Sequence, residues 1–84
     1  MYKIEFARSF EKSLKKLSPV EQKLVAEKLK IFVTDPYHPS LRTKKIQSLS
    51  NIFELSVNMS IRIIWKYKDR ELILLLDIGR HDIL

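Results

Sequence analysis

The sequence of 84 residues contains no cysteine. Disulfide bonds, thiolate metal sites and thiol nucleophiles are therefore excluded. The sequence also lacks an apolar run long enough to cross a membrane, since the longest one, residues 72–76, has the length of a buried strand. Residues 1–5 show neither the apolar core nor the cleavage site of a signal peptide. We therefore expect a protein that is made and used in the cytoplasm, without a membrane partner.

Acidic side chains are in the minority, with 10 Asp and Glu against 16 Lys and Arg, which gives a net charge of +6. The excess lies in residues 1–51, because residues 52–84 carry as many acidic as basic side chains. Such an excess suits a polyanionic partner, since Lys and Arg neutralise phosphates and release counterions. A lysine-rich, solvated helix surface explains the charge equally well. Charge alone does not decide between these two interpretations.

The first half of the chain carries one strand pattern and two helix patterns. Residues 2–6 alternate as in a short strand, and apolar residues then recur at helical spacing on a first helix: Phe6, Phe10, Leu14 and Leu17. Ser18 is a good N-cap for a second helix, because Pro19 suits the first helical position and Glu21 completes a capping box. This helix should end before Asp35, since the proline that follows disfavours helical geometry there. Two helices joined at Ser18 form a helical hairpin.

The second half of the chain carries one loop pattern and three strand patterns. Residues 37–51 contain turn formers and a basic cluster, and they predict an ordered loop. The strand patterns, at residues 52–58, 61–68 and 71–78, are separated by short breaks and predict an antiparallel meander. On the middle strand, Arg62 and Lys66 should point away from the apolar face that the helices cover, towards the open, concave side. The length suits one domain, residues 1–84, of the α+β class with the order strand, helix, helix and three strands.

Four short motifs follow one another along this chain. They are Tyr-Lys-Ile-Glu-Phe at residues 2–6 with the helical segment 10–17, His-Pro-Ser-Leu-Arg-Thr-Lys-Lys-Ile at 38–46, Ile-Arg-Ile-Ile-Trp at 61–65 and Ile-Gly-Arg-His-Asp-Ile at 78–83. Together they resemble the RelE/ParE superfamily of bacterial toxins, over essentially the whole chain. The resemblance implies the RelE-like fold, a small curved antiparallel sheet packed against an N-terminal strand and a helical hairpin. It also implies a cognate antitoxin protein as a partner.

The same resemblance implies a function. Ribonuclease members of the superfamily cut messenger RNA in the A site of the ribosome, whereas ParE members inhibit DNA gyrase and cut no RNA. Metal-free cleavage needs a base for the ribose 2′-hydroxyl, an acid for the leaving 5′-oxygen and cations around the transition state. Imidazole, with an ordinary pKa of about 6.5, suits the first two roles, and guanidinium and ammonium groups suit the third. We therefore expect a metal-independent, ribosome-dependent endoribonuclease that needs no cofactor.

Seven residues match the positions that the family uses for this chemistry. His81 matches the histidine that acts as acid or base, His38 matches the histidine of the His-Pro loop, and Arg62 matches the arginine that holds the scissile phosphate. Four further residues match phosphate contacts: Arg42, Lys44, Lys45 and Arg80. The plain alternatives are an exposed histidine at position 81, a turn residue before Pro39 and solvated charges elsewhere. Asp77 and Asp82 are not spaced as a metal pair, and no metal site is expected.

Two departures from the family pattern keep other functions open. Ser56 stands where YafQ-like members carry a second site histidine, and no aromatic residue follows His81 in the sequence. A ParE-like gyrase inhibitor without nuclease activity, or a catalytically decayed member that only binds its antitoxin, are therefore the alternatives. The histidines favour the nuclease, because binding alone does not need them.

Two further groups of residues are expected to be structural. Trp65 and Tyr67 could stack on bases, but their strand spacing beside Ile63 favours the core. The helix lysines are expected on solvated faces: Lys12, Lys15, Lys16, Lys23, Lys28 and Lys30.

Overall fold

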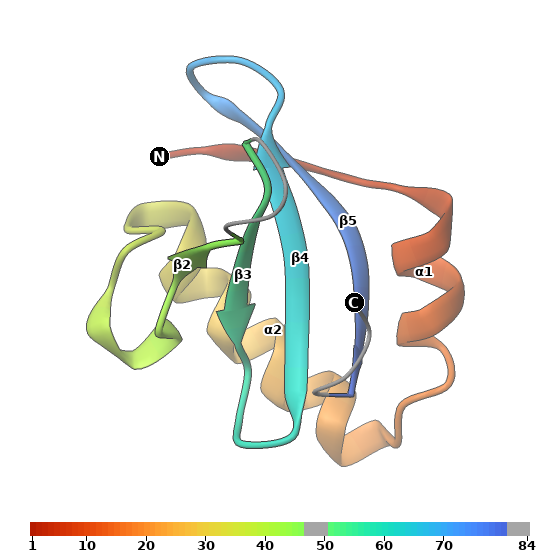
Figure 1. Cartoon of the computed structure of the whole chain (residues 1–84). Helices are drawn as coiled ribbons and strands as arrows, with labels where there is room; N and C mark the ends of the chain where they lie inside the picture. The colour runs from red at the N-terminus through yellow and green to blue at the C-terminus, as the bar shows by residue number, and fades with distance from the viewer. Residues whose placement is uncertain (47–50, 81–84) are drawn as a thin grey trace.

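The strands and helices expected from the sequence form an α+β fold in which both helices pack against a five-stranded sheet (Figure 1). The computed structural model describes residues 1–46 and 51–80. Its elements, in chain order, are β1 (Lys3–Phe6), α1 (Arg8–Leu14), α2 (Pro19–Thr34), the 3-10 helix η1 (Pro39–Leu41), β2 (Lys44–Lys45), β3 (Phe53–Ser56), β4 (Ile61–Tyr67) and β5 (Leu72–Arg80). No helix in these two described ranges is long and apolar enough to cross a membrane.

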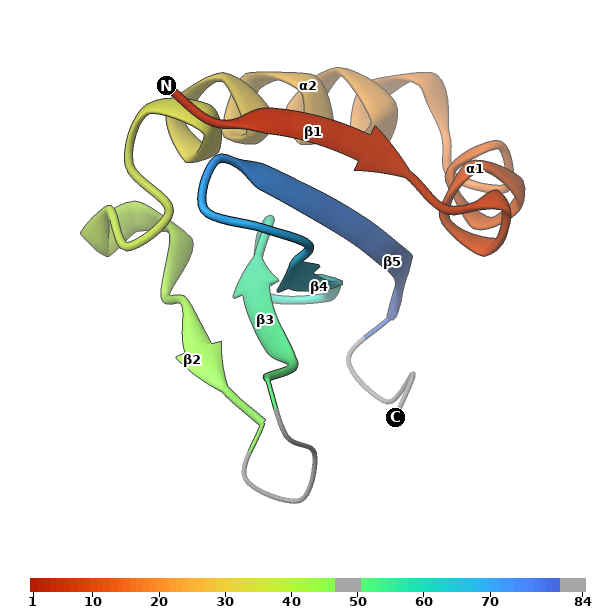
Figure 2. The same ribbon diagram turned by 90° about the horizontal axis from the view of Figure 1, so that it is seen from above.

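The sheet has the strand order β1-β5-β4-β3-β2 and is visibly curved in Figure 2. The expected antiparallel meander of β3, β4 and β5 is confirmed. The sheet is nevertheless mixed, because β1 pairs with β5 in parallel. No hairpin links these two strands, so local turn geometry does not set their relative direction. The segment expected as a loop also contributes the two-residue strand β2, which pairs with Phe53 and Glu54.

The two hairpin turns of the meander are held by side chains that mimic a backbone turn. The Oδ1 atom of Asn58 accepts hydrogen bonds from the backbone N–H groups of Ser60 and Ile61, both at 2.8 Å. Asp69 does the same in the second turn for Glu71 and Leu72. Short polar side chains at these positions favour tight turns. The first turn fixes where β4 begins, and therefore where the Arg62 side chain projects from the sheet.

The beginning of α2 is the capping box that the sequence predicts. The Ser18 hydroxyl accepts a hydrogen bond from the Glu21 backbone N–H at 3.1 Å, and the Glu21 carboxylate accepts one from the Ser18 backbone N–H at 2.9 Å. An N-cap of this kind typically stabilises a helix by about 1 kcal/mol. The helix ends at Thr34, immediately before Asp35, as expected from the proline that follows.

The helical hairpin is open: α2 lies across the view in Figure 2, whereas α1 is seen nearly end-on. β1 pairs with the first part of β5, residues 72–75, and α1 continues along the part that β1 leaves unpaired. The Ser9 hydroxyl donates to the Leu76 carbonyl, and the Ser13 hydroxyl donates to the Asp77 carboxylate at 2.8 Å. α1 therefore covers the edge of β5 that follows residue 75. Without α1, this edge would be open to pairing with another chain.

The core lies between the helices and one face of the sheet, as the period-two pattern predicts. Its buried side chains are Phe10, Val25, Phe32, Leu41, Leu55, Val57, Ile61, Ile63, Trp65, Ile73, Leu75 and Ile78. Trp65 is fully buried and stacks on Phe53, with ring centroids 4.7 Å apart, while Phe32 meets it edge-on at 4.9 Å. Tyr67 packs against the same cluster, and burial raises the pKa of its hydroxyl well above the ordinary value. The expectation that these two aromatic side chains belong to the core is confirmed.

Candidate functional site

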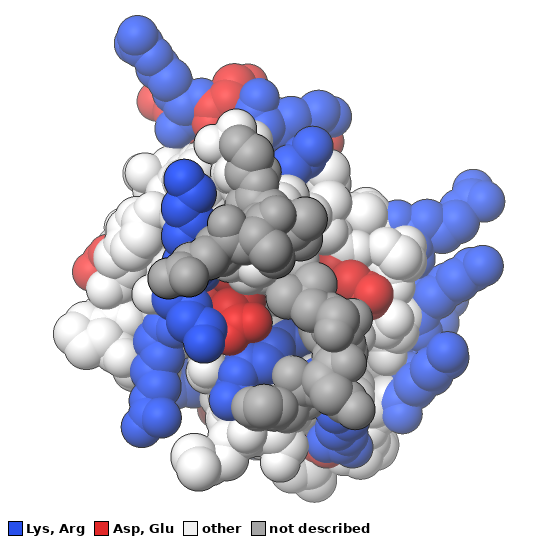
Figure 3. All heavy atoms as spheres, in the orientation of Figure 1, with Lys and Arg blue, Asp and Glu red and all other residues white. Residues whose placement is uncertain are grey.

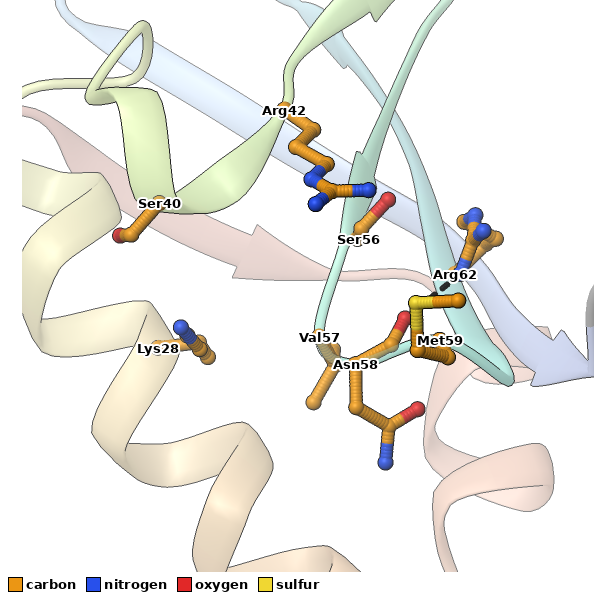
Figure 4. A pocket seen from close by; sticks show the side chains of 8 residues that line it. All are labelled: Lys28, Ser40, Arg42, Ser56, Val57, Asn58, Met59 and Arg62. Atoms are coloured by element: carbon orange, nitrogen blue, oxygen red, sulfur yellow. Dashed lines mark hydrogen bonds between the residues drawn. The ribbon is translucent and has the colours of Figure 1, made fainter.

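A pocket of about 260 Å³ lies between α2, η1 and the β3–β4 hairpin (Figure 4). Its lining consists of Lys28, Ser40, Arg42, Ser56, Val57, Asn58, Met59 and Arg62. Three cationic side chains thus enter from three different elements, and no carboxylate is among the described residues that line the pocket. This concentration of positive charge, with hydroxyl and amide groups between the cations, suits an anionic ligand.

Arg62 is the most firmly placed of the three cations. It lies on β4 between Ser56 of β3 and Gly79 of β5, and its side chain is half-buried. Its Nη1 atom donates to the carbonyl oxygens of Asn58 at 2.7 Å and Ile61 at 3.3 Å. Both bonds use one nitrogen, so the other N–H donors of the guanidinium can bind a ligand. The Arg62 guanidinium is therefore held in place with donors left over for an anionic ligand.

Arg42 reaches the same pocket from the end of η1. Its backbone adopts the left-handed conformation, with φ 49° and ψ 42°, and its N–H donates to the Pro39 carbonyl at 3.2 Å. This conformation is uncommon for residues other than glycine and is found repeatedly at ligand sites. In Figure 4 the Arg42 guanidinium points towards the Ser56 hydroxyl. Of the residues expected to bind phosphate, Arg42 is the one that lines the pocket together with Arg62.

His38 has a structural role beside this pocket. Its Nδ1 atom accepts a hydrogen bond from the Ser40 backbone N–H at 3.1 Å and lies 2.9 Å from the Ser40 hydroxyl. The His38 side chain thereby caps the beginning of η1. This bond requires Nδ1 without a proton, so the neutral ring carries its proton on Nε2. The imidazole is exposed and is not part of the pocket lining. His38 therefore shapes the loop that presents Ser40 and Arg42.

Lys44 and Lys45 form the edge strand β2 and are exposed. The Lys44 ammonium lies 3.4 Å from the carboxylate of Glu54, its neighbour on β3. Ion pairs at a protein surface stabilise by at most about 1 kcal/mol. Because the Lys44 side chain is 71% exposed, its ammonium group stays accessible to a further anion. Both lysines lie outside the pocket, at the adjoining edge of the sheet.

Arg80, at the end of β5, is paired with the beginning of α2. Its Nη1 atom lies 2.8 Å from the Glu21 Oε2 atom, and Glu21 is also the capping-box residue. The Ser18 backbone N–H, followed by the Arg80 guanidinium, lowers the pKa of the Glu21 carboxyl from its usual range. In this arrangement Arg80 connects the sheet to α2, and its guanidinium would have to leave Glu21 in order to bind another anion.

Glu21 should make the stability of the fold depend on acidic pH. Its pKa is lower in the folded chain than in the unfolded chain, so it contributes stability above the usual glutamate range. That contribution disappears as the pH falls through the lowered value. We expect Glu21→Gln to be less stable than the native chain at neutral pH, and the difference to shrink as the pH falls from there through the lowered pKa. Thermal unfolding of both chains across this range measures it, and a constant difference would contradict the assignment.

Lys28 is a pocket residue that the sequence analysis assigned to a solvated face. The other five lysines of that group are exposed as expected, whereas Lys28 is half-buried. A signal was present, because Lys28 lies three residues after Val25 and four before Phe32, both of which are buried. Residues at this spacing share one side of a helix. The expectation that Lys28 is fully solvated is therefore wrong.

His81, the expected acid or base, lies outside the described residues.

Comparison with known structures reveals the fold. A chain of the archaeal RelE–RelB complex from Pyrococcus horikoshii matches with a TM-score of 0.79 and 16% identity, over 99% of this chain and 98% of that one. A chain of the Escherichia coli DinJ–YafQ complex matches with 0.71 and 21% identity, over 100% and 98%. A YoeB/ParE toxin from Agrobacterium tumefaciens matches with 0.80 and 6% identity, over 94% and 98%. No protein-family model and no curated protein matches significantly. The chain therefore has the RelE-like fold that its motifs predict.

Proposed function

We propose that this RelE-like chain is the toxin of a type II toxin–antitoxin system and a ribosome-dependent endoribonuclease that cleaves messenger RNA. It would act in the cytoplasm as one domain, residues 1–84. The observation that carries the proposal is a pocket on this fold that both Arg62 and Arg42 line. No carboxylate is among the described residues of its lining. Such a pocket suits a phosphodiester, and guanidinium groups stabilise the charge that develops when the diester is attacked.

The proposed reaction requires neither a metal nor a cofactor. A base removes the proton of the ribose 2′-hydroxyl, and the 2′-oxygen attacks the adjacent phosphorus. The 5′-oxygen leaves with a proton from an acid, and the products are a 2′,3′-cyclic phosphate and a 5′-hydroxyl end. His81 and His38 are proposed for these two proton transfers, with His38 in the acid role because its Nε2 atom carries a proton while Nδ1 accepts from the Ser40 N–H. Arg62, anchored on the Asn58 carbonyl, would hold the phosphate.

The proposed partners are an RNA and a protein. Blue Lys and Arg side chains are prominent on the face in Figure 3, where they outnumber the red acidic ones. Messenger RNA in the ribosomal A site would lie against this basic surface, with Lys44, Lys45 and Arg80 on its phosphates. A cognate antitoxin with acidic side chains would cover the same surface and block access. The RelE–RelB and DinJ–YafQ complexes support such a partner.

The proposal is tested by producing the chain in cells without an antitoxin and mapping the 5′ ends of messages. New ends within translated regions are expected together with growth arrest. His81→Ala should remove both effects while keeping the unfolding temperature of the native chain. Growth arrest without new ends would contradict the nuclease, and equal killing by both chains would remove His81 from the mechanism.

A ParE-like gyrase inhibitor is the second candidate. The likeness to the Agrobacterium toxin described as YoeB/ParE favours it, because both branches share this fold. A supercoiling assay with the purified chain separates the two, since inhibition of gyrase is expected of this candidate alone. A chain with neither cuts, gyrase inhibition nor growth effect would be a decayed member that only binds an antitoxin.

A further inference from the structure

The pocket contains one cation that the proposed reaction does not use. Lys28 comes from α2, on the helix-covered side of the sheet, whereas Arg62 comes from the strand opposite Ser56 (Figure 4). β2 pairs with β3 at Phe53 and Glu54, and none of the residues of β3 beyond them pairs with β2. The pocket therefore lies beyond this short edge strand, at the edge of β3, between the open side of the sheet and α2.

The charges of the pocket are not balanced by the described parts of the protein. Between described residues there are three ion pairs, Lys44–Glu54, Lys68–Glu5 and Arg80–Glu21, and none involves a cation of the pocket. Lys28 is moreover half-buried, so its stem packs against the protein while its ammonium group can face the pocket that it lines. Three like charges around one small volume repel each other. A bound anion would remove this repulsion.

The size and lining of the pocket indicate which anion fits. Its volume, about 260 Å³, lies below the range of about 300–1,000 Å³ that is usual for whole small-molecule ligands. The hydroxyls of Ser40 and Ser56 and the amide of Asn58 can donate to phosphate oxygens. Met59, which is largely exposed, offers an apolar surface for a sugar ring. A short stretch of backbone, two phosphates joined by one ribose, fits these features better than a complete nucleotide cofactor.

We propose that Lys28 and Arg42 bind a second backbone phosphate of single-stranded RNA, next to the phosphate held by Arg62. The RNA strand would thus pass from the open side of the sheet around the edge of β3 to α2. The choice of RNA as the source of this phosphate rests on the proposed function, whereas the phosphate chemistry rests on the pocket alone. A free phosphate ion is the other source of the same chemistry.

The test measures binding of a short, fluorescent, 2′-O-methyl RNA that cannot be cleaved, by anisotropy at several salt concentrations. Loss of one phosphate contact on a single strand should reduce the slope of log K against log salt by about 0.7. We expect this reduction, with weaker binding, for Lys28→Gln. The matched control is Lys30→Gln, an exposed lysine two residues further along α2, which should bind as the native chain does. Equal behaviour of the two variants would overturn the proposal.

A double variant tests whether Lys28 and Arg42 serve one phosphate. If they do, Lys28→Gln with Arg42→Gln should lose less binding energy than the sum of the two single variants. A simple sum would indicate separate contacts and would refute the shared site. In a second arm, inorganic phosphate is titrated while the backbone amide signals of Ser56 and Asn58 are followed by NMR. Signals that shift with phosphate, together with unchanged RNA binding by Lys28→Gln, would assign the pocket to the free ion and reject RNA.

This test is independent of cleavage. If the chain cuts no messages but Lys28→Gln still weakens binding of the uncleavable RNA, the nuclease proposal fails and the phosphate site stands. If messages are cut and Lys28→Gln binds RNA as Lys30→Gln does, the phosphate site alone fails. Unfolding temperatures of all variants must match that of the native chain, so that a loss of binding reports the pocket and not the fold.

Discussion

Arg62→Ala is expected to lower RNA cleavage by about 100- to 1,000-fold, the usual effect of removing a donor from developing negative charge. Arg62 is half-buried on β4 and anchored by the Asn58 carbonyl at 2.7 Å, so its remaining donors are directed before substrate arrives. Alanine removes these donors from the pocket. The measurement is the single-turnover rate of cleavage of a message on purified ribosomes.

The matched control for Arg62 is Lys66→Ala. Lys66 lies four residues further along β4, on the same side of the strand, and is also half-buried, but it does not line the pocket. The Lys66→Ala variant should cleave RNA at a rate within a few-fold of that of the native chain. The cleavage rate of Arg62→Lys should lie between those of Arg62→Ala and the native chain, because an ammonium group keeps the charge but not the forked donors. If Arg62→Ala and Lys66→Ala cleave equally well, Arg62 does not hold the scissile phosphate.

Trp65→Ala is expected to lower the free energy of unfolding by about 3–5 kcal/mol. The side chain is fully buried, with Phe53 stacked at 4.7 Å and Phe32 edge-on at 4.9 Å, and small domains have only about 5–15 kcal/mol in total. The variant should therefore unfold at a clearly lower urea concentration than the native chain. Because Trp65 is the only tryptophan, far-UV circular dichroism in urea must replace fluorescence as the probe.

Two further variants separate the causes of this destabilisation. The stability of Trp65→Phe should lie between those of the native chain and Trp65→Ala. Phenylalanine keeps an aromatic ring and removes a buried indole N–H that has no acceptor within residues 1–46 and 51–80. Val20→Ala, at a residue of α2 that is 78% exposed, should change stability by no more than about 0.5 kcal/mol. A Trp65→Ala effect as small as that of Val20→Ala would show that the aromatic cluster does not stabilise the fold.

Most of the fold could be predicted because local residues control it. Ser18 and Glu21 fix where α2 begins whatever surrounds them, and Asn58 and Asp69 form their turns within a few residues. Alternation along β4 identified the buried face because burial repeats with the period of the strand. The parallel direction of β1 and the existence of β2 could not be predicted, since both depend on hydrogen bonds to strands distant in the sequence.

The candidate site was only partly predictable. Arg62 and Arg42 were selected from motifs, and the structure brings them to one pocket. His38, selected by the same reasoning, caps η1, and Arg80 pairs with Glu21. The turn role before Pro39 was the plain alternative for His38, whereas no sequence pattern identifies the pairing of Arg80 with Glu21. The catalytic roles of these residues stay predictions.

The sequence by itself determined the class of the fold, the order of its elements and the buried face of the sheet, because helix caps, turns and apolar periods act over a few residues. The tertiary structure alone decided which cations share a pocket. Lys28, Arg42 and Arg62 are distant along the chain and come from a helix, a loop and a strand. Electrostatic interaction depends on distance in space, and only the packing of α2 against the sheet makes these three charges neighbours.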